Sequence, residues 1–197
     1  MPPAEPTTAD SPEGSAPDEP NSNASAAPPI RGASRPSIAI HALSRVGHEH
    51  PSSTPELADW LEAQVRRAAE LCGLTRAEVS IAIVDDDEMA ELHEHYAGVP
   101  GTTDVLTFDL ADAAADDDRP NPQSIEGDVV VCIDQAQRQA EARGHETRHE
   151  LLLYAVHGLL HLVGEDDTTP DAFERMHARE DALLTEMGFG PLFNAER

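Results

Sequence analysis

The sequence contains no lysine. All 13 of its basic residues are arginine, they are outnumbered by 38 acidic residues, and the formal net charge is −25 at pH 7. Because binding to a phosphate backbone depends on Lys and Arg, such a surface argues against a non-specific polynucleotide binder, and no DNA partner is expected. The charge does not exclude a groove that is lined locally by arginine.

Cysteine and long apolar runs are also scarce. Cys72 and Cys132 fit no metal or redox spacing and make no disulfide scaffold, so we expect small buried thiols in a reducing compartment. No segment approaches the ~18 apolar residues of a membrane span. The N-terminus lacks a basic segment followed by an apolar one, so no secretory signal is expected. These absences predict a cytoplasmic protein that has no membrane partner.

Two regions differ in composition. Residues 1–35 are mainly Pro, Ala, Ser, Asp and Glu, almost none of which can be buried, so they are predicted to form a disordered tail. Residues 36–197 suit a single domain, because domains commonly have about 100–150 residues. With 39% hydrophobic and 4% aromatic residues, the chain can build one modest core.

Strand and helix patterns alternate through this domain. Strands are predicted at 37–43, 79–84, 104–109 and 127–133. Helices are predicted from the Thr54-Pro55 cap to Gly73 and at 89–95, 134–143, 147–163 and 170–187. An acidic loop is predicted at 111–126. This alternation, followed by hairpin-like strands, indicates an α+β fold in which helices cover a small mixed β-sheet.

The most informative segment is the end of the helix predicted over 147–163. His157 and His161 are four residues apart, so their side chains lie one turn apart on the same helix face and can bind one Zn²⁺. Gly164 lets the chain turn back, so that the acidic run 165–167 can supply a third ligand. Three protein ligands and an open fourth position are typical of catalytic zinc, which activates water near neutral pH.

The spacing H-x-x-x-H-x-x-G-x-x-D also overlaps that of zinc proteases. Those enzymes have a Glu general base directly after the first His, where this chain has Gly158. The difference argues against peptide hydrolysis, and no residue is assigned as the general base. A single buried His is usually structural, but two buried imidazoles in a helix of Leu and Val are unfavourable unless both have partners.

The other histidines do not fit this pattern. His48, His50, His93 and His95 are expected in solvated loop or surface positions. His149 is expected either at the surface or behind the metal ligands.

Three motifs resemble those of one known family. Residues 157–167 are similar to the H-G-x-L-H-L-x-G-x-D-H motif of the YbeY endoribonucleases, residues 103–108 to their T-D-V-L-S-F, and residues 127–132 to their G-D-I-V-I-C. The motifs occur in the same order, and the resemblance covers about residues 36–190.

The resemblance implies a YbeY-like fold with one zinc ion per chain in a cleft. His157 and His161 match the first two ligand positions, and Asp167 stands where the family usually has a third His. Asp166 matches the Asp of the motif and is interpreted as structural. The implied function is a single-strand-specific zinc endoribonuclease of rRNA maturation, including processing of the 16S 3′ end, and of ribosome quality control. The implied partners are rRNA and the small ribosomal subunit.

Some positions leave alternatives open. The family usually has an Arg where this chain has Ala97, and an Arg there would be a natural phosphate clamp. Its loss favours a ribosome-associated factor with a structural metal site and little nuclease activity; another zinc hydrolase is the third possibility. Asp104 and Asp128 either cap a strand end or line the cleft, and Thr103 is expected to be a turn hydroxyl.

Overall fold

The computed structural model describes residues 37–47, 49–111 and 123–193. The predicted tail at 1–35, most of the predicted acidic loop and His48 lie outside the described residues. None of the helices in the described part is long and apolar enough to cross a membrane.

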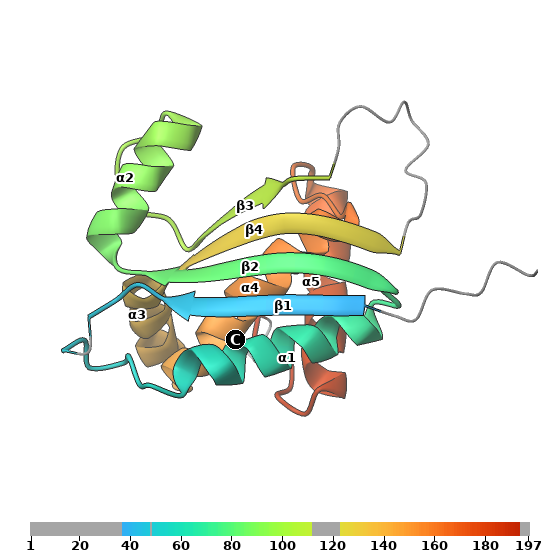
Figure 1. Ribbon diagram of the computed structural model, residues 1–197, viewed down its shortest axis with the longest axis horizontal. Helices are drawn as coiled ribbons and strands as arrows, with labels where there is room; N and C mark the ends of the chain where they lie inside the picture. Colours follow the sequence, from blue (N-terminus) through green and yellow to red (C-terminus); the bar gives the residue numbers. More distant parts are fainter. Residues whose placement is uncertain (1–36, 48, 112–122, 194–197) are drawn as a thin grey trace, which may run out of the picture. The chain divides into compact units, whose positions relative to one another are not determined.

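Four strands form one mixed sheet in the described residues (Figure 1). They are β1 (Ser37–Ser44), β2 (Arg76–Val84), β3 (Val105–Asp109) and β4 (Ser124–Cys132). The order across the sheet is β1-β2-β4-β3; β1, β2 and β4 are parallel, and β3 runs antiparallel to β4. The mixed sheet that the sequence predicted is therefore confirmed.

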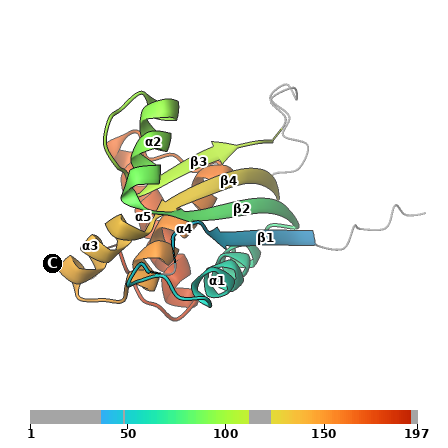
Figure 2. The same cartoon turned by 60° about the vertical axis from the view of Figure 1, so that its left-hand side comes forward.

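Helices pack on both faces of this sheet. They are α1 (Leu57–Leu71), α2 (Asp86–Ala97), α3 (Ile133–Arg143), α4 (Thr147–Val163) and α5 (Pro170–Glu186). The main core lies between the sheet and α1, α4 and α5, and a smaller apolar cluster under α2 lies on the other face. Figure 2 shows α1 beside the β1 edge and α2 near the β3 edge. The predicted α+β fold is confirmed.

Several boundaries differ from the prediction. Helix α1 begins at Leu57, because the Leu57 N–H is bonded to the Thr54 carbonyl in a turn, and the N-cap is Glu56, not Thr54. Strand β2 begins at Arg76, before the predicted residue 79, and β4 begins at Ser124, inside the predicted loop. These two extensions pair with each other, Arg76 opposite Ser124, so tertiary contact lengthens both strands. Helix α2 starts at Asp86, before residue 89, because the Asp85 carboxylate accepts the Glu88 N–H.

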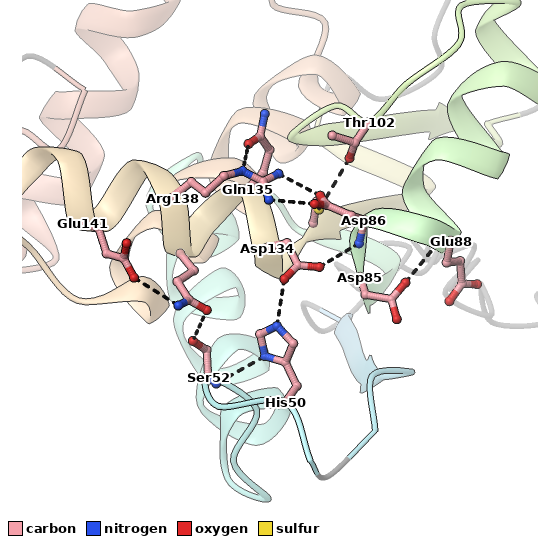
Figure 3. Close-up of polar contacts among 12 residues, drawn as sticks. His50, Ser52, Asp85, Asp86, Glu88, Thr102, Asp134, Gln135, Arg138 and Glu141 are labelled. Carbon is pink, nitrogen blue, oxygen red and sulfur yellow. Dashed lines mark hydrogen bonds and ion pairs between the residues drawn. The ribbon is translucent and has the colours of Figure 1, made fainter.

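A polar network holds the loop before α1 against the starts of α2 and α3 (Figure 3). His50 Nε2 lies 2.9 Å from Asp134 Oδ1, and the other oxygen of Asp134 accepts the Asp86 N–H at 2.8 Å. Arg138 closes the network with two hydrogen bonds to the Asp86 carboxylate. The prediction of a solvated His50 was wrong: its side chain is 14% exposed and has a carboxylate partner.

Helix α4 approaches the sheet most closely at Gly158. An ideal Cβ built there would lie 2.7 Å from Val129 Cγ1 and 2.9 Å from Thr107 Oγ1, closer than real Cβ atoms come. Gly127 makes a similar approach from β4, where a Cβ would lie 2.6 Å from the Phe108 carbonyl. The two glycines allow α4, with His157 and His161, to lie directly on β3 and β4.

We predict that Gly158→Glu lowers the free energy of unfolding by about 3 kcal/mol or more, because the new side chain overpacks the interface and buries a charge. The measurement is urea unfolding of wild type, Gly158→Glu and a control variant. The control is Gly47→Glu, which adds the same charge where a Cβ meets nothing within 4 Å; a change within about 0.5 kcal/mol is expected there. Equal stability of the two variants would contradict the packing argument.

Candidate metal centre and cleft

The structure brings together His157, His161 and Asp167. The two histidines occupy the last turns of α4, and Gly164 ends the helix with a φ of 101°, which returns the chain toward them. His157 Nε2 and His161 Nε2 are 3.0 Å apart. Asp167 places its carboxylate oxygens 3.7 Å from His157 Nε2 and 3.9 Å from His161 Nε2.

The partners of the two rings fix which nitrogen of each carries the proton. His157 Nδ1 lies 3.2 Å from the Glu180 carboxylate, and His161 Nδ1 lies 3.1 Å from the Glu165 carbonyl oxygen. Both partners can only accept, so in the neutral rings both Nδ1 atoms donate. Both Nε2 lone pairs therefore point toward the Asp167 carboxylate, and three acceptors converge on one point with no donor between them.

This donor set fits a zinc ion. Ligand atoms about 2.1 Å from a tetrahedral metal are about 3.4 Å from one another, close to the three separations found here. Two imidazoles and one carboxylate leave the fourth position open, as in catalytic zinc sites. The other acidic residues of the run are engaged elsewhere: Glu165 pairs with Arg179, and Asp166 accepts from the Thr168 hydroxyl and N–H. These contacts are compatible with the structural role predicted for Asp166, which stays a prediction.

The sequence analysis missed His177 and Glu180 of α5. Glu180 is 1% exposed, and its second carboxylate oxygen lies 2.8 Å from His177 Nδ1, so this carboxylate bridges two imidazoles. His157, His177 and Glu180 also lie close enough to hold a metal. Their contacts are already satisfied as hydrogen bonds, which favours the set that contains Asp167 as the metal site.

Glu180 sets the electrostatics of the ligand it touches. Burial opposes a charged imidazole, but the hydrogen bond and the charge of Glu180 outweigh it and raise the pKa of His157. Burial also opposes ionisation of Glu180, but hydrogen bonds from His157 and His177 outweigh it and lower the pKa of the carboxyl group. An ionised Glu180 makes its partner imidazole a stronger metal ligand.

Two cavities meet at His157. The α3–α4 cavity has a volume of about 350 Å³ and is lined by residues of α3, α4 and α5, among them Glu180, and by residues outside these helices, among them Asp104 and Asp167. The β3 cavity has a volume of about 450 Å³ and lies between β3 and the end of α4, with His161 in its wall. Asp104 and His157 line both cavities. The candidate metal position therefore lies where the two cavities adjoin, and the two together are called the cleft.

The remaining predicted residues divide between this cleft and other places. Asp104 both lines the cleft and caps its strand, since its Oδ1 accepts the Val105 N–H and the Thr103 hydroxyl. Asp128 lines neither cavity, because β4 alternates and its neighbours Val130 and Cys132 face α2.

His149, His93, His95 and Ala97 line neither of the two cavities. His149 is not behind the metal ligands: its ring packs on Trp60 and Phe189, at centroid distances of 6.2 and 5.3 Å. His93 contacts the Gly101 carbonyl, whereas His95 is exposed as predicted. Ala97 is exposed at the end of α2.

Comparisons with known proteins agree with the motifs. A family model described as Endoribonuclease YbeY matches residues 45–188. A protein named Endoribonuclease YbeY from Bifidobacterium animalis subsp. lactis (strain AD011) is 37% identical over 134 residues, 68% of this chain and 71% of that protein. One of the same name from Mycobacterium tuberculosis (strain ATCC 25618 / H37Rv) is 42% identical over 113 residues, 56% of this chain.

The match spans 64% of that mycobacterial protein, slightly less than two thirds of its length. Among solved structures, the solution structure of TM1509 from Thermotoga maritima aligns with a TM-score of 0.49 and 23% identity. It covers 76% of this chain and 92% of that one. The segment that matches the family model contains every residue of the candidate metal centre.

We predict that Asp167→Ala loses most of its zinc, because two imidazoles alone make an incomplete site. The measurement is elemental analysis after dialysis, with about one zinc per chain expected in wild type. Asp166→Ala is the matched control and should retain its zinc, since Asp166 is bonded to Thr168. Full zinc in Asp167→Ala would show that another group is the third ligand.

We predict that Glu180→Gln lowers zinc affinity by about 10- to 100-fold, because an amide has one acceptor oxygen for the two imidazole N–H groups and no negative charge to make His157 a stronger ligand. Zinc affinity is measured by competition with a chromogenic chelator. Glu174→Gln makes the same charge change at an exposed position of α5 and should bind zinc as wild type does. If the affinity of Glu180→Gln were unchanged, Glu180 would have no part in orienting His157.

Proposed function

This chain belongs to the YbeY endoribonuclease family, and we propose that it is a zinc-dependent endoribonuclease that cleaves single-stranded RNA. The observation that carries the proposal is the convergence of three acceptors, His157 Nε2, His161 Nε2 and the Asp167 carboxylate, at the centre of an open cleft. Relatives named endoribonucleases support the choice of reaction.

The residues of the chain would act by orientation. Glu180 and the Glu165 carbonyl hold the two imidazoles with Nε2 toward the ion, and Asp167 completes its protein ligands. When bound, zinc supplies Lewis acidity beside the scissile phosphate. Both cavities are lined by His157, so an RNA strand bound across them would have its target bond near the candidate metal position.

Gly158 argues against a zinc protease. The general base of those enzymes would have to project from this position, where the structure has no room even for a Cβ. Packing of α4 on Val129 thus removes the protease base and keeps the metal ligands, which favours a hydrolase of another bond.

We extend the proposal to the biological substrate. We propose ribosomal RNA as the target, with maturation of the 16S 3′ end and ribosome quality control as the roles, and the small ribosomal subunit as the partner. The support for this extension is membership of the YbeY family, whose resemblance implied these roles and this partner. The proposed compartment is the cytoplasm, in keeping with the two free cysteines.

A second candidate is a ribosome-associated factor whose metal is mainly structural. The acidity of the cleft favours it: Asp104, Glu150 and Glu180 line the α3–α4 cavity together with Asp167. Zinc-loaded protein that cosediments with small ribosomal subunits and never cuts RNA would establish this alternative.

We predict that the zinc-loaded protein cleaves a single-stranded oligoribonucleotide and leaves the same sequence intact in a duplex. The variant His157→Ala, His161→Ala should show only background cleavage, whereas His95→Ala, at an exposed position, should act as wild type does. Denaturing gels measure the rates, and mass spectrometry of the new 3′ ends distinguishes attack by water from attack by the ribose 2′-OH, which leaves a cyclic phosphate. Normal cleavage by the double variant would refute the proposed function.

A further inference from the structure

The α3–α4 cavity extends from the metal centre toward the start of α4, where Glu150 lies. This carboxylate is 0% exposed. Its Oε1 accepts a hydrogen bond from Arg143 NH1 at 2.9 Å, and its Oε2 lies 2.7 Å from His145 Nε2. Burial raises the pKa of the Glu150 carboxyl group, and the nearby charges of Arg143 and His145 oppose that rise.

Arg143 is the one basic side chain among the described residues that line the two cavities. It is the last residue of α3, and its side chain is 33% exposed. A guanidinium group has five N–H donors, and the hydrogen bond to Glu150 uses one of them.

Arg138 of the same helix shows how an engaged guanidinium differs (Figure 3). Its Nε donates to Gln135 Oε1 at 2.8 Å, and its NH1 and NH2 groups donate to the two Asp86 oxygens at 2.6 and 2.8 Å. The fork of Arg138 is therefore occupied within the protein. Arg143, by contrast, donates one hydrogen bond to Glu150 and is among the residues that line the α3–α4 cavity.

We propose that Arg143 binds a backbone phosphate of single-stranded RNA in the α3–α4 cavity; this inference rests on the proposed function. The guanidinium fork matches a phosphate group and keeps its charge at every working pH. Glu150 holds it in place from behind. The other lining residues suit a nucleoside: Gln135 and Gln139 offer amides, and Tyr154 and Phe173 offer aromatic surface.

The geometry separates this phosphate from the scissile one. Glu150 and His157 lie on the same face of α4, seven residues or about 10 Å apart along the helix axis. One phosphate group does not span that distance. Arg143 therefore holds a neighbouring nucleotide and positions the strand across the metal centre, while the scissile phosphate lies at His157.

A structural role for Arg143, as the countercharge of Glu150, makes a different prediction. Removing Arg143 alone would leave the buried Glu150 carboxylate without its guanidinium partner and could unfold the chain. The variant Arg143→Gln, Glu150→Gln avoids this problem, because it removes one charge of each sign and keeps a pair that can form a hydrogen bond. The net charge of −25 is unchanged, so long-range repulsion of RNA stays the same.

The experiment measures binding of a fluorescent 12-nucleotide 2′-O-methyl RNA to the full-length zinc-loaded protein by anisotropy at several NaCl concentrations. The paired variant should bind about tenfold more weakly, equally for uridine and adenine oligomers, as expected for a lost contact with phosphate. In a plot of log affinity against log salt concentration, the slope for the paired variant should be shallower than that of wild type by about 0.7. Glu150→Gln alone should bind at least as tightly as wild type, and the control Arg138→Ala should stay within about twofold.

Unchanged affinity and slope in the paired variant would overturn the inference and leave Arg143 as the countercharge of Glu150. Displacement of the RNA by inorganic phosphate, but not by chloride at equal ionic strength, in wild type and not in the paired variant would support a contact between Arg143 and a phosphate group. Cleavage of unmodified RNA is measured in parallel. If wild type cleaves RNA and the paired variant binds and cleaves it equally well, only the inference about Arg143 is refuted. If RNA binding depends on Arg143 but wild type does not cleave, the inference is supported and the proposed nuclease activity is refuted. If wild type neither binds nor cleaves RNA, both proposals are refuted.

Discussion

The hydrogen bond between His157 Nδ1 and the buried carboxylate of Glu180 connects the fold to the metal centre. It crosses from α4 to α5, and the same carboxylate holds His177, whose ring stacks on Phe193 with centroids 3.6 Å apart. The position of α5 therefore determines which nitrogen of His157 faces the metal. A carboxylate with 1% exposure would be unfavourable without these two N–H partners, so the site and the α4–α5 interface depend on each other.

The elements predictable from the sequence are those whose signal is local. The spacing of His157 and His161 together with Gly164 predicted two histidines on one helix face and a turn after them, and α4 has the predicted bounds. Spacing alone left the third candidate ligand open among three neighbouring acids, and the partners of Glu165 and Asp166 in the structure favour Asp167. The local pattern could not show the partner of Glu165, because Arg179 lies on α5, whereas Thr168, the partner of Asp166, is only two residues away.

The missed features come from contacts between residues distant in sequence. Strands β2 and β4 extend each other over residues 76–78 and 124–126, and His50 is paired with Asp134, which lies 84 positions away. Glu180 did leave a signal: it lies four residues from buried Met176 and four from buried Leu184, within the apolar stripe of α5. A buried acid in such a stripe requires a partner, and the unassigned histidines were the candidates.

Electrostatics sets the remaining constraint on an acidic chain that acts on RNA. The charge of −25 repels a polyanion at long range, but salt at physiological strength screens that field within about 8 Å. Attraction then has to come from groups within the cleft. A bound zinc ion would offset the charge of Asp167. His157 and His177 share the charge of Glu180, and Arg143 offsets Glu150. Added salt weakens the contact at Arg143 and also weakens the long-range repulsion, so the two effects oppose each other. RNA binding by this chain should consequently depend less on salt than binding by a basic nuclease that makes the same number of phosphate contacts.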